Sequence, residues 1–351
     1  MNRAMRRIFG SLRSSGASPR TSSLGASTPS SDAFDTTCYV NPELRPAFSK
    51  FRDMLGNVEL THETIAGRRD RTLSLPPLPE PAWKEHTIPG PPEAPGVRVY
   101  VVNGGARNGA LRPAILYMHG GGFVMGDALS SIRNVQQLAA AVGCVIVTVD
   151  YRLAPETRFP GALEDNYAGL KWLYSNAAEL GVDHTRIAVV GESAGGGHAA
   201  TLTIAARDRG EIPLIYQALI YPMLDDRTGS ARKTPPHTGI IIWNEQMNRF
   251  GWSSLLGVPA GSRHVPDGSV PARVENLHGL PPTFIGVGSI DLFVEEDISY
   301  ALRLIDAGVS VELHVVPGAF HGFDMLEDTL IAQRFKEALI TALTNAFRPE
   351  V

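Results

Sequence analysis

Residues 187–197 read IAVVGESAGGG, a short apolar run followed by a serine between two glycines and then by small residues. This order predicts a buried strand, a very tight turn at Ser193 and a helix. Gly191 and Gly195 lack the Cβ atoms that would collide in such a turn. The turn exposes the serine hydroxyl and directs the positive end of the helix dipole toward it. Because the chain has 35 glycines, the short match alone could arise by chance, and the assignment of a nucleophilic serine depends on finding its partners.

Apolar or β-branched runs recur along the chain, with helical patterns between most of them. The predicted strands are 97–102, 114–118, 144–149, 187–190, 216–221, 283–287 and 311–316. The clearest helical patterns are 132–141, 162–176 and 297–307. Alternation of this kind is typical of an α/β fold in which helices cover both faces of a mostly parallel sheet. Ligands bind such sheets beyond the carboxyl ends of the strands, where Ser193 is placed.

A long insertion interrupts this alternation. About sixty residues separate the strand that ends at Tyr221 from the next predicted strand. Long insertions in compact α/β domains commonly form lids or binding elements. We place a cap insertion at about residues 225–260 of a core that spans residues 83–351, and we expect it to cover the active site.

The segment before this core, residues 37–82, is expected to form cap helices. It ends in a proline-rich connector, and a weaker helix is predicted to include Leu60–Ile65. A stronger helical spacing is formed by Leu44, Phe48, Phe51 and Leu55.

The N-terminal tail has a composition of its own. Its first 31 residues contain nine serines, five arginines and no acidic residue. Such a segment is predicted to be disordered, and we end it at residue 36. Organelle transit peptides share this composition, whereas a secretory signal needs a continuous apolar segment. With only two cysteines, Cys38 and Cys144, in no metal-like spacing, the protein is expected in the cytoplasm, with an organelle as the alternative.

Charge and hydropathy exclude two classes of partner. The chain has 32 basic and 36 acidic residues, and five of the basic residues lie in the tail. An acidic body without a basic stripe argues against nucleic-acid binding. No apolar run approaches the roughly 18 residues that cross a bilayer, so no membrane span is expected.

A glycine-rich loop follows the 114–118 strand. There His119 precedes Gly120, Gly121 and Gly122. Successive glycines allow backbone N–H groups to approach a ligand closely. The loop could therefore donate hydrogen bonds to a developing oxyanion opposite Ser193. The alternative is a tight turn without a catalytic partner.

Two further residues could complete the site. His321 follows the last predicted strand in the loop PGAFHGF, and Asp291 follows the strand before it. Histidine can act as a base near neutral pH, and a carboxylate can orient it. Asp291 could also cap the helix that follows. In contrast, His314 within a strand is expected to be a packing residue, and His198, five residues after Ser193, is expected on the face of a helix. Ser193 would thus be one of three catalytic side chains that follow different strands.

Taken together, these motifs resemble the hormone-sensitive lipase-like family of α/β-hydrolase esterases. The matching segments are HGGGFVMG at 119–126, VDYRLAPE at 149–156, GESAGG at 191–196, GSIDLFVEE at 288–296 and PGAFHGF at 317–323. The resemblance implies an α/β-hydrolase fold with an eight-stranded, mostly parallel sheet and a helical cap. It also implies a Ser193–Asp291–His321 triad and no cofactor or metal.

The resemblance further assigns the oxyanion hole to the N–H groups of Gly121, Gly122 and Ala194. Two positions depart from the common family pattern. Leu292 and Phe293 follow the triad acid where many members have proline and leucine, which predicts local repacking. Glu192 precedes the serine where other members often have aspartate or threonine.

The resemblance implies a serine carboxylesterase that hydrolyses short- to medium-chain acyl esters through an acyl-enzyme. Its partner would be a small ester molecule, and a homodimer could form through the 311–316 strand. The alternatives are a deacetylase or amidase with the same triad, or a non-catalytic receptor on a hydrolase scaffold; such receptors lack the histidine that is present here. Apolar candidates for the substrate pocket are Phe123, Met223, Trp243 and Phe250.

Overall fold

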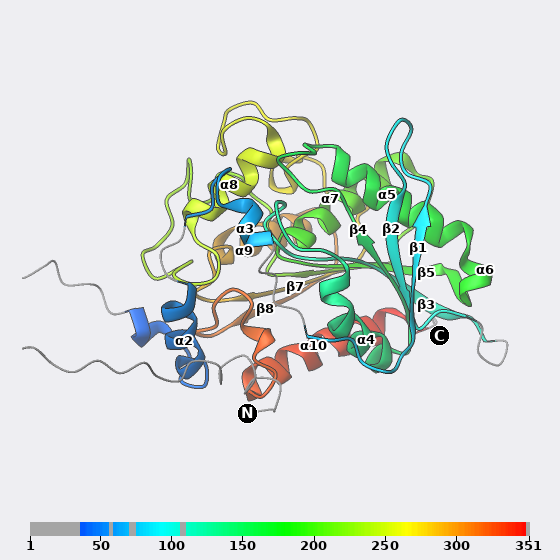
Figure 1. Cartoon of the computed structure of the whole chain (residues 1–351), viewed down its shortest axis with the longest axis horizontal. Coiled ribbons are helices and arrows are strands. Elements are labelled where there is room, and N and C mark those ends of the chain that lie inside the picture. The colour runs from blue at the N-terminus through cyan, green and yellow to red at the C-terminus, as the bar shows by residue number, and fades with distance from the viewer. Residues whose placement is uncertain (1–35, 56–58, 70–74, 106–109, 349–351) are drawn as a thin grey trace, which may run out of the picture.

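An eight-stranded β-sheet runs through the centre of the protein (Figure 1). The computed structural model describes residues 36–55, 59–69, 75–105 and 110–348. The strands are β1 Trp83–Ile88, β2 Val97–Val102, β3 Arg112–Met118, β4 Val145–Asp150, β5 Val182–Glu192, β6 Tyr216–Ile220, β7 Thr283–Gly288 and β8 Val311–Val316. They lie in the order β1-β2-β4-β3-β5-β6-β7-β8. β2 is antiparallel to both neighbours, and all other pairs are parallel.

All seven predicted runs form strands, β2 to β8, and the expectation of an eight-stranded, mostly parallel sheet is confirmed. β6 and β7 are buried along their whole length, because both of their faces are covered. β1 has no counterpart among the predicted runs. Its sequence, WKEHTI, is mostly polar and mostly exposed, because β1 lies at one edge of the sheet.

Helices cover both faces of the sheet (Figure 1). One layer contains α5 (Gly161–Ser175), α7 (Ala194–Arg209) and α9 (Val294–Asp306), and the other contains α4 (Ile132–Val142) and α10 (Leu330–Ala346). Alternate side chains of β5 enter the two cores, Val189 on the α7 side and Val190 on the α10 side. The shorter elements are α6 (Ala177–Leu180) and 3₁₀ turns at Thr36–Tyr39, Leu129–Ser131, Pro271–Arg273 and Phe323–Met325.

A third apolar cluster lies beyond the carboxyl ends of the strands. It combines residues that follow β3, β5, β6 and β7 with α8 (Glu245–Leu256), which belongs to the insertion after β6. The N-terminal segment also reaches this cluster, because Leu60 and Ile65 are buried in it. Gln246 of α8 hydrogen-bonds both backbone groups of Leu60, at 3.1 and 2.8 Å. The insertion and residues before the core therefore meet at the end of the sheet that carries Ser193.

The N-terminal helices differ in part from the prediction. α2 (Arg45–Leu55) agrees with the predicted spacing, and its Phe48 ring packs 6.0 Å from that of Phe320. The weaker helix predicted to include Leu60–Ile65 is wrong in its position, because α3 spans Ile65–Arg69 and shares only Ile65 with that range. The hydroxyl of Thr64 donates to the carbonyl of Glu59 at 2.9 Å, and such local bonds compete with a helix. The tail predicted for residues 1–36 lies outside the described residues except for its last position.

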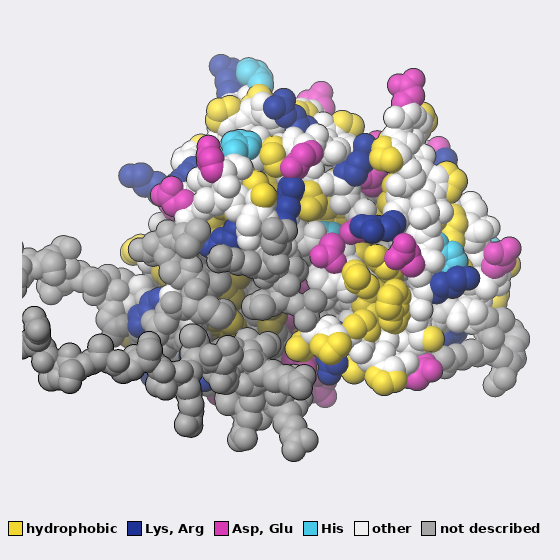
Figure 2. All heavy atoms as spheres, in the orientation of Figure 1, with side chains coloured by type: hydrophobic (Ala, Val, Ile, Leu, Met, Phe, Trp, Pro, Cys, Tyr) yellow, Lys and Arg dark blue, Asp and Glu magenta, His cyan; other side chains and the backbone are white. Residues whose placement is uncertain are grey.

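On the face shown in Figure 2, basic and acidic side chains are interspersed, without a continuous basic stripe among the coloured atoms. Within the described ranges, no helix combines the length and the apolar character that a membrane crossing requires.

Candidate active site

Ser193 occupies a strained turn between β5 and α7. β5 ends at Glu192 and α7 begins at Ala194, which leaves Ser193 alone in the turn with φ 55° and ψ −120°. Positive φ is uncommon for a residue with a side chain and marks stored backbone strain. A Cβ atom added to Gly191 would collide with the carbonyl group of Gly195. The two glycines that flank the serine therefore allow the turn to close.

Ser193 and His321 are directly hydrogen-bonded, and so are His321 and Asp291. Nε2 of His321 lies 2.9 Å from Oγ of Ser193, and its Nδ1 lies 2.8 Å from Oδ2 of Asp291. All three side chains are buried. A carboxylate can only accept a hydrogen bond, so Nδ1 carries the proton and Nε2 can accept one from the serine hydroxyl. The structure thus brings together the three side chains that the sequence assigns to separate strand ends.

The second oxygen of Asp291 serves the local backbone. Oδ1 accepts a hydrogen bond of 3.0 Å from the N–H of Phe293, immediately before α9. One carboxylate therefore orients the turn before the helix through one oxygen and His321 through the other. The two roles expected for Asp291 are geometrically compatible.

Aromatic rings hold the imidazole of His321 on two sides. The Tyr221 ring lies edge-on to the imidazole with the ring centroids 4.6 Å apart, and the Phe293 ring lies edge-on to it with a centroid distance of 5.2 Å. The Tyr221 hydroxyl donates to Oδ1 of Asp324 at 2.8 Å. Asp324 lies in the 3₁₀ turn that follows His321. Sequence reasoning did not find Tyr221 or Asp324, because neither belongs to a periodic pattern that points to the site.

The glycine loop after β3 lies against the serine turn. A Cβ atom added to Gly120 would lie 3.4 Å from the Cβ of Ser193. Gly121 and Gly122 have φ values of 130° and 60°, which only glycine adopts readily. Among the described residues, no hydrogen bond uses the N–H groups of these two glycines. Ala194 opens α7, so its own N–H has no acceptor within the helix.

His119, the first residue of this loop, is held in place by Tyr151. The Tyr151 hydroxyl donates to the carbonyl oxygen of His119 at 2.6 Å, and the two rings stack with their centroids 4.2 Å apart. His198 is buried edge-on to the Tyr151 ring at 4.6 Å. Burial lowers the pKa of His198 to about 3, so it is neutral at physiological pH. His198 lies in helix α7, as the sequence predicts, and packs against Tyr151.

The four predicted pocket residues do not occupy equivalent places. Phe123, Met223 and Trp243 are buried together in the third cluster, which also contains Ala194. Phe250 is only partly buried, and its ring lies edge-on to His62 at 5.2 Å. Three of the candidates therefore lie in the cluster next to the serine turn, and the fourth packs on its outer side.

An acidic pair, Glu192 and Asp324, lies near His321. Burial, together with the nearby carboxylate of Asp324, raises the pKa of Glu192 to about 7. Burial also raises the pKa of Asp324. The residue that distinguishes this GESAG motif from the common family pattern is therefore part of a charge cluster that includes the turn after His321.

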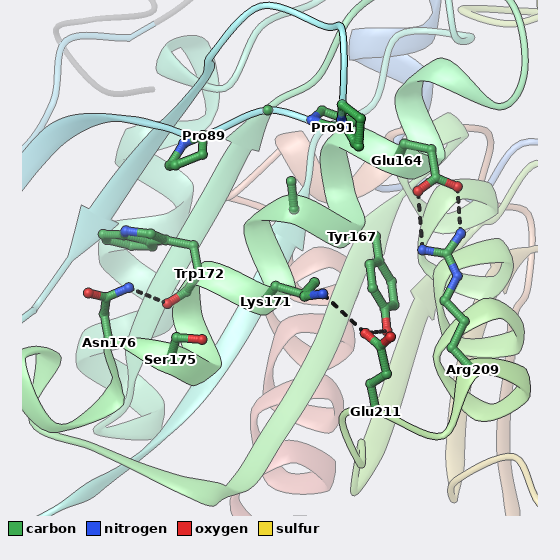
Figure 3. A pocket seen from close by; sticks show the side chains of 13 residues that line it. Pro89, Pro91, Glu164, Tyr167, Lys171, Trp172, Ser175, Asn176, Arg209 and Glu211 are labelled. Atoms are coloured by element: carbon green, nitrogen blue, oxygen red, sulfur yellow. Dashed lines mark hydrogen bonds and ion pairs between the residues drawn. The ribbon is translucent and has the colours of Figure 1, made fainter.

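A separate cavity of about 560 Å³ opens between the β1–β2 turn and α5 (Figure 3). Its charged groups pair with one another: Arg209 bonds Glu164 at 2.5 Å, and Glu211 lies 3.3 Å from Lys171. The Arg209 guanidinium also lies over the Tyr167 ring at 4.0 Å. Among the residues that the structure describes, no histidine lines this cavity. Its side chains therefore do not provide the nucleophile and base that the strand ends bring together.

Comparisons with known proteins agree with this fold. Residues 115–325 match the sequence model of a family described as alpha/beta hydrolase fold. Esterase LipI of Mycobacterium tuberculosis is 32% identical over 309 residues, which cover 83% of this chain and 91% of that protein. Ethyl acetate hydrolase of Pseudomonas putida is 33% identical over 263 residues, covering 74% and 78%. The solved structure of a bacterial heroin esterase superposes with a TM-score of 0.75 at 34% identity, covering 90% of this chain and 100% of that one.

Proposed function

We propose that Ser193, Asp291 and His321 form the catalytic triad of this chain. The chain belongs to the hormone-sensitive lipase-like family of α/β-hydrolase esterases and is a serine carboxylesterase. The observation that carries the assignment is the continuous hydrogen-bonded path from Ser193 Oγ through the imidazole to Asp291. The same three groups in the same relation perform acyl transfer on several unrelated folds.

In the first half of the proposed reaction, Oγ of Ser193 attacks the ester carbonyl carbon while Nε2 of His321 takes the hydroxyl proton. Asp291 keeps the imidazole in the required tautomer and stabilises the cation that forms. The tetrahedral intermediate then collapses, and His321 returns the proton to the departing alcohol. In the second half, a water molecule attacks the acyl-enzyme with the same base, which releases the acid and regenerates Ser193.

The N–H groups of Gly121, Gly122 and Ala194 are proposed to stabilise the oxyanion. The positive φ values of the two glycines and the place of Ala194 at the start of α7 support this assignment. Donors fixed before the reaction bind the charge that develops in the transition state, and loss of one such donor typically lowers turnover by about 10²–10³-fold. The positive end of the α7 dipole adds to the same effect.

The substrates are proposed to be small esters with short to medium acyl chains. The buried apolar side chains of Phe123, Met223 and Trp243 next to the serine turn support an apolar acyl site of limited size. A relative of this chain is named for the hydrolysis of ethyl acetate, which supports the short end of the range.

Replacement of Ser193 by alanine tests the triad. The Ser193→Ala variant is expected to lose nearly all hydrolysis of p-nitrophenyl butyrate and to retain the melting temperature of the wild type within a few degrees. The matched control is Ser175→Ala, a serine in the cavity of Figure 3, which should leave the rate unchanged. A Ser193→Ala enzyme with the wild-type rate would rule out the nucleophile.

We also propose that β8 pairs with a second copy to form a homodimer. β8 is the edge strand opposite β1, and its Leu313 and Val315 are exposed. Leu302 and Ile305 of the adjoining α9 are exposed as well. Light scattering coupled to size exclusion should report twice the chain mass for the wild type and a monomer for Val315→Lys; a wild-type monomer at micromolar concentration would contradict the proposal.

The proposed location is the cytoplasm. The support is compositional: Cys144 is a buried packing residue of the core, and the chain has only one other cysteine. A fluorescent fusion of the full chain, compared with one that lacks residues 1–36, would reveal organelle targeting if the two proteins distribute differently.

A further inference from the structure

A strained turn lies in the insertion after β6. The N–H of Trp243 donates to the carbonyl of Ile241 at 2.7 Å, which makes Ile242 the centre of a three-residue turn. Ile242 has φ 66°, a value that is a true outlier for a β-branched residue. Three-residue turns with a positive central φ are rare and strained. Strain of this kind persists only where the surrounding structure fixes it, and it concentrates at functional sites.

One anchor of the turn is the indole of Trp243. Its Nε1 donates to Oδ1 of Asn248 at 3.2 Å, and Nδ2 of Asn248 donates to the carbonyl of Thr228 at 2.8 Å. Asn248 is fully buried in α8, and Trp243 is almost fully buried. The orientation of the indole is therefore set by a buried hydrogen bond as well as by packing.

The indole points at the proposed oxyanion loop. A Cβ atom added to Gly122 would collide with Cη2 of Trp243, so the far edge of the ring lies against the Cα of that glycine. A Cβ atom added to Gly251 of α8 would lie 2.5 Å from the carbonyl oxygen of Gly122. Gly122 is thus enclosed by the ring on one side and by the α8 backbone on another.

The same turn also approaches the histidine loop. A Cβ atom added to Gly322, the residue after His321, would lie 3.7 Å from Cδ1 of Ile242. Residues 241–243 therefore lie between the loop that carries the proposed oxyanion donors and the loop that carries the proposed base. A substrate bound to Ser193 has its carbonyl oxygen about 3 Å from the donor N–H groups, so its acyl or alcohol group begins within a few atoms of this turn.

We propose that the turn Ile241–Trp243 is the element that limits acyl-chain length, because the Trp243 indole fills the space beside Gly122 into which a longer chain would extend. Ile242, through its positive backbone φ, holds the indole ring in that place. The inference rests on the proposed function, because it assumes that the acyl group is attached at Ser193. It narrows the proposed substrates to the short end of the acyl-chain range.

A chain-length series tests the limit directly. We would measure kcat/KM for p-nitrophenyl esters from acetate to dodecanoate with the wild type, Trp243→Ala and Trp243→Phe. Pocket contacts with single methylenes discriminate by roughly 10–200-fold, so the octanoate-to-acetate ratio of kcat/KM should rise by about tenfold or more in Trp243→Ala. The smaller ring of Trp243→Phe should give an intermediate ratio and keeps a measurement available if the alanine variant folds poorly.

A control substitution distinguishes the effect of the Trp243 side chain on chain length from a general loss of packing. Trp172→Ala removes an indole from the cavity of Figure 3, outside the triad and its loops. It should leave the chain-length ratio at the wild-type value. The inference is overturned if the octanoate-to-acetate ratio of both Trp243 variants equals that of the wild type. An equal loss of activity at every chain length is one way in which this result would appear.

A double-mutant cycle tests the contact with Gly122. Gly122→Ala should lower acetate hydrolysis by about 10²-fold or more, because the new methyl group meets the indole. In the Trp243→Ala background the collision is absent, so the same substitution should cost at least about tenfold less. Strictly additive losses would contradict the contact. Loss of the proposed function is distinguishable, because it would appear as full activity in Ser193→Ala rather than as an unchanged chain-length ratio.

Discussion

The hydroxyl of Tyr221 donates a hydrogen bond of 2.8 Å to Asp324, and the ring of the same tyrosine lies edge-on to His321. Tyr221 directly follows β6, whereas His321 and Asp324 lie beyond β8. One side chain thereby ties two loops of the site together, and it does so with an unusual backbone φ of 36°. The position of the imidazole depends on this tie as well as on Asp291.

Replacement of Tyr221 by phenylalanine isolates the hydrogen bond. The ring contact with His321 is kept, but the buried carboxyl of Asp324 loses its partner. An unsatisfied buried polar group costs about 1–3 kcal/mol, so the free energy of unfolding in urea should fall by that amount. Turnover of p-nitrophenyl acetate should fall by less than about tenfold. Unchanged stability would show that the hydroxyl has an equivalent alternative partner.

The triad acid gives a second prediction. Asp291→Asn can still accept the Phe293 N–H through its amide oxygen, so the fold should survive. It no longer favours the productive imidazole tautomer, and kcat should fall by about 10⁴-fold. Glu295→Gln, an exposed acid in the first turn of α9, is the control and should retain wild-type kcat. Equal effects of the two substitutions would remove the special role of Asp291.

The raised pKa of Glu192 leads to a prediction about how the stability of the fold depends on pH. Burial and the Asp324 carboxylate raise its pKa from 4.5 to about 7. The folded protein therefore holds this proton more tightly than the unfolded chain, and the corresponding stability is lost as the pH rises from about 4.5 to about 7. The Glu192→Gln variant has no proton to lose. The difference in melting temperature, Glu192→Gln minus wild type, should therefore be larger at pH 8 than at pH 5. For the exposed control Glu337→Gln, this difference should be the same at both pH values. A constant offset between the two pH values would contradict the raised pKa.

The glycine before the serine gives a steric prediction. In Gly191→Ala the new methyl group would meet the backbone carbonyl of Gly195, which cannot move without opening the turn. Overpacking of this kind costs about 1–3 kcal/mol or more, and the serine should also lose its position. Gly67→Ala in α3 is the matched control, because no atom of the described residues outside its own helix backbone lies within 4 Å of the added Cβ. Normal activity and stability in Gly191→Ala would show that the turn relaxes freely.

Local sequence predicts much of this molecule. The strand that ends before Ser193, and six others, stand out because buried strands are near-continuous apolar runs. The glycine loop, Asp291 and His321 are recognisable because each directly follows such a run. β1 escapes detection because an edge strand can be polar, and the order of the strands in the sheet is a property of the fold rather than of any one segment.

The walls of the site are harder to predict. Nothing in the segment GIIIW indicates that Ile242 takes a positive φ or that Trp243 reaches Gly122, 121 positions earlier in the chain. Both features arise from tertiary contacts of an insertion without regular periodicity. The position of Glu192 near Asp324 likewise requires two distant loops to meet. Chemistry is therefore readable from motifs, whereas substrate choice depends on contacts that form only in the fold.

Covalent labelling tests the central claim most directly. Diisopropyl fluorophosphate reacts with a serine only where a base activates it, so peptide mass spectrometry of the treated wild type should find one adduct, on the peptide that contains Ser193. The His321→Ala variant should remain unlabelled under the same conditions. An adduct on another residue, or equal labelling of Ser193 without His321, would contradict the triad on which the account rests.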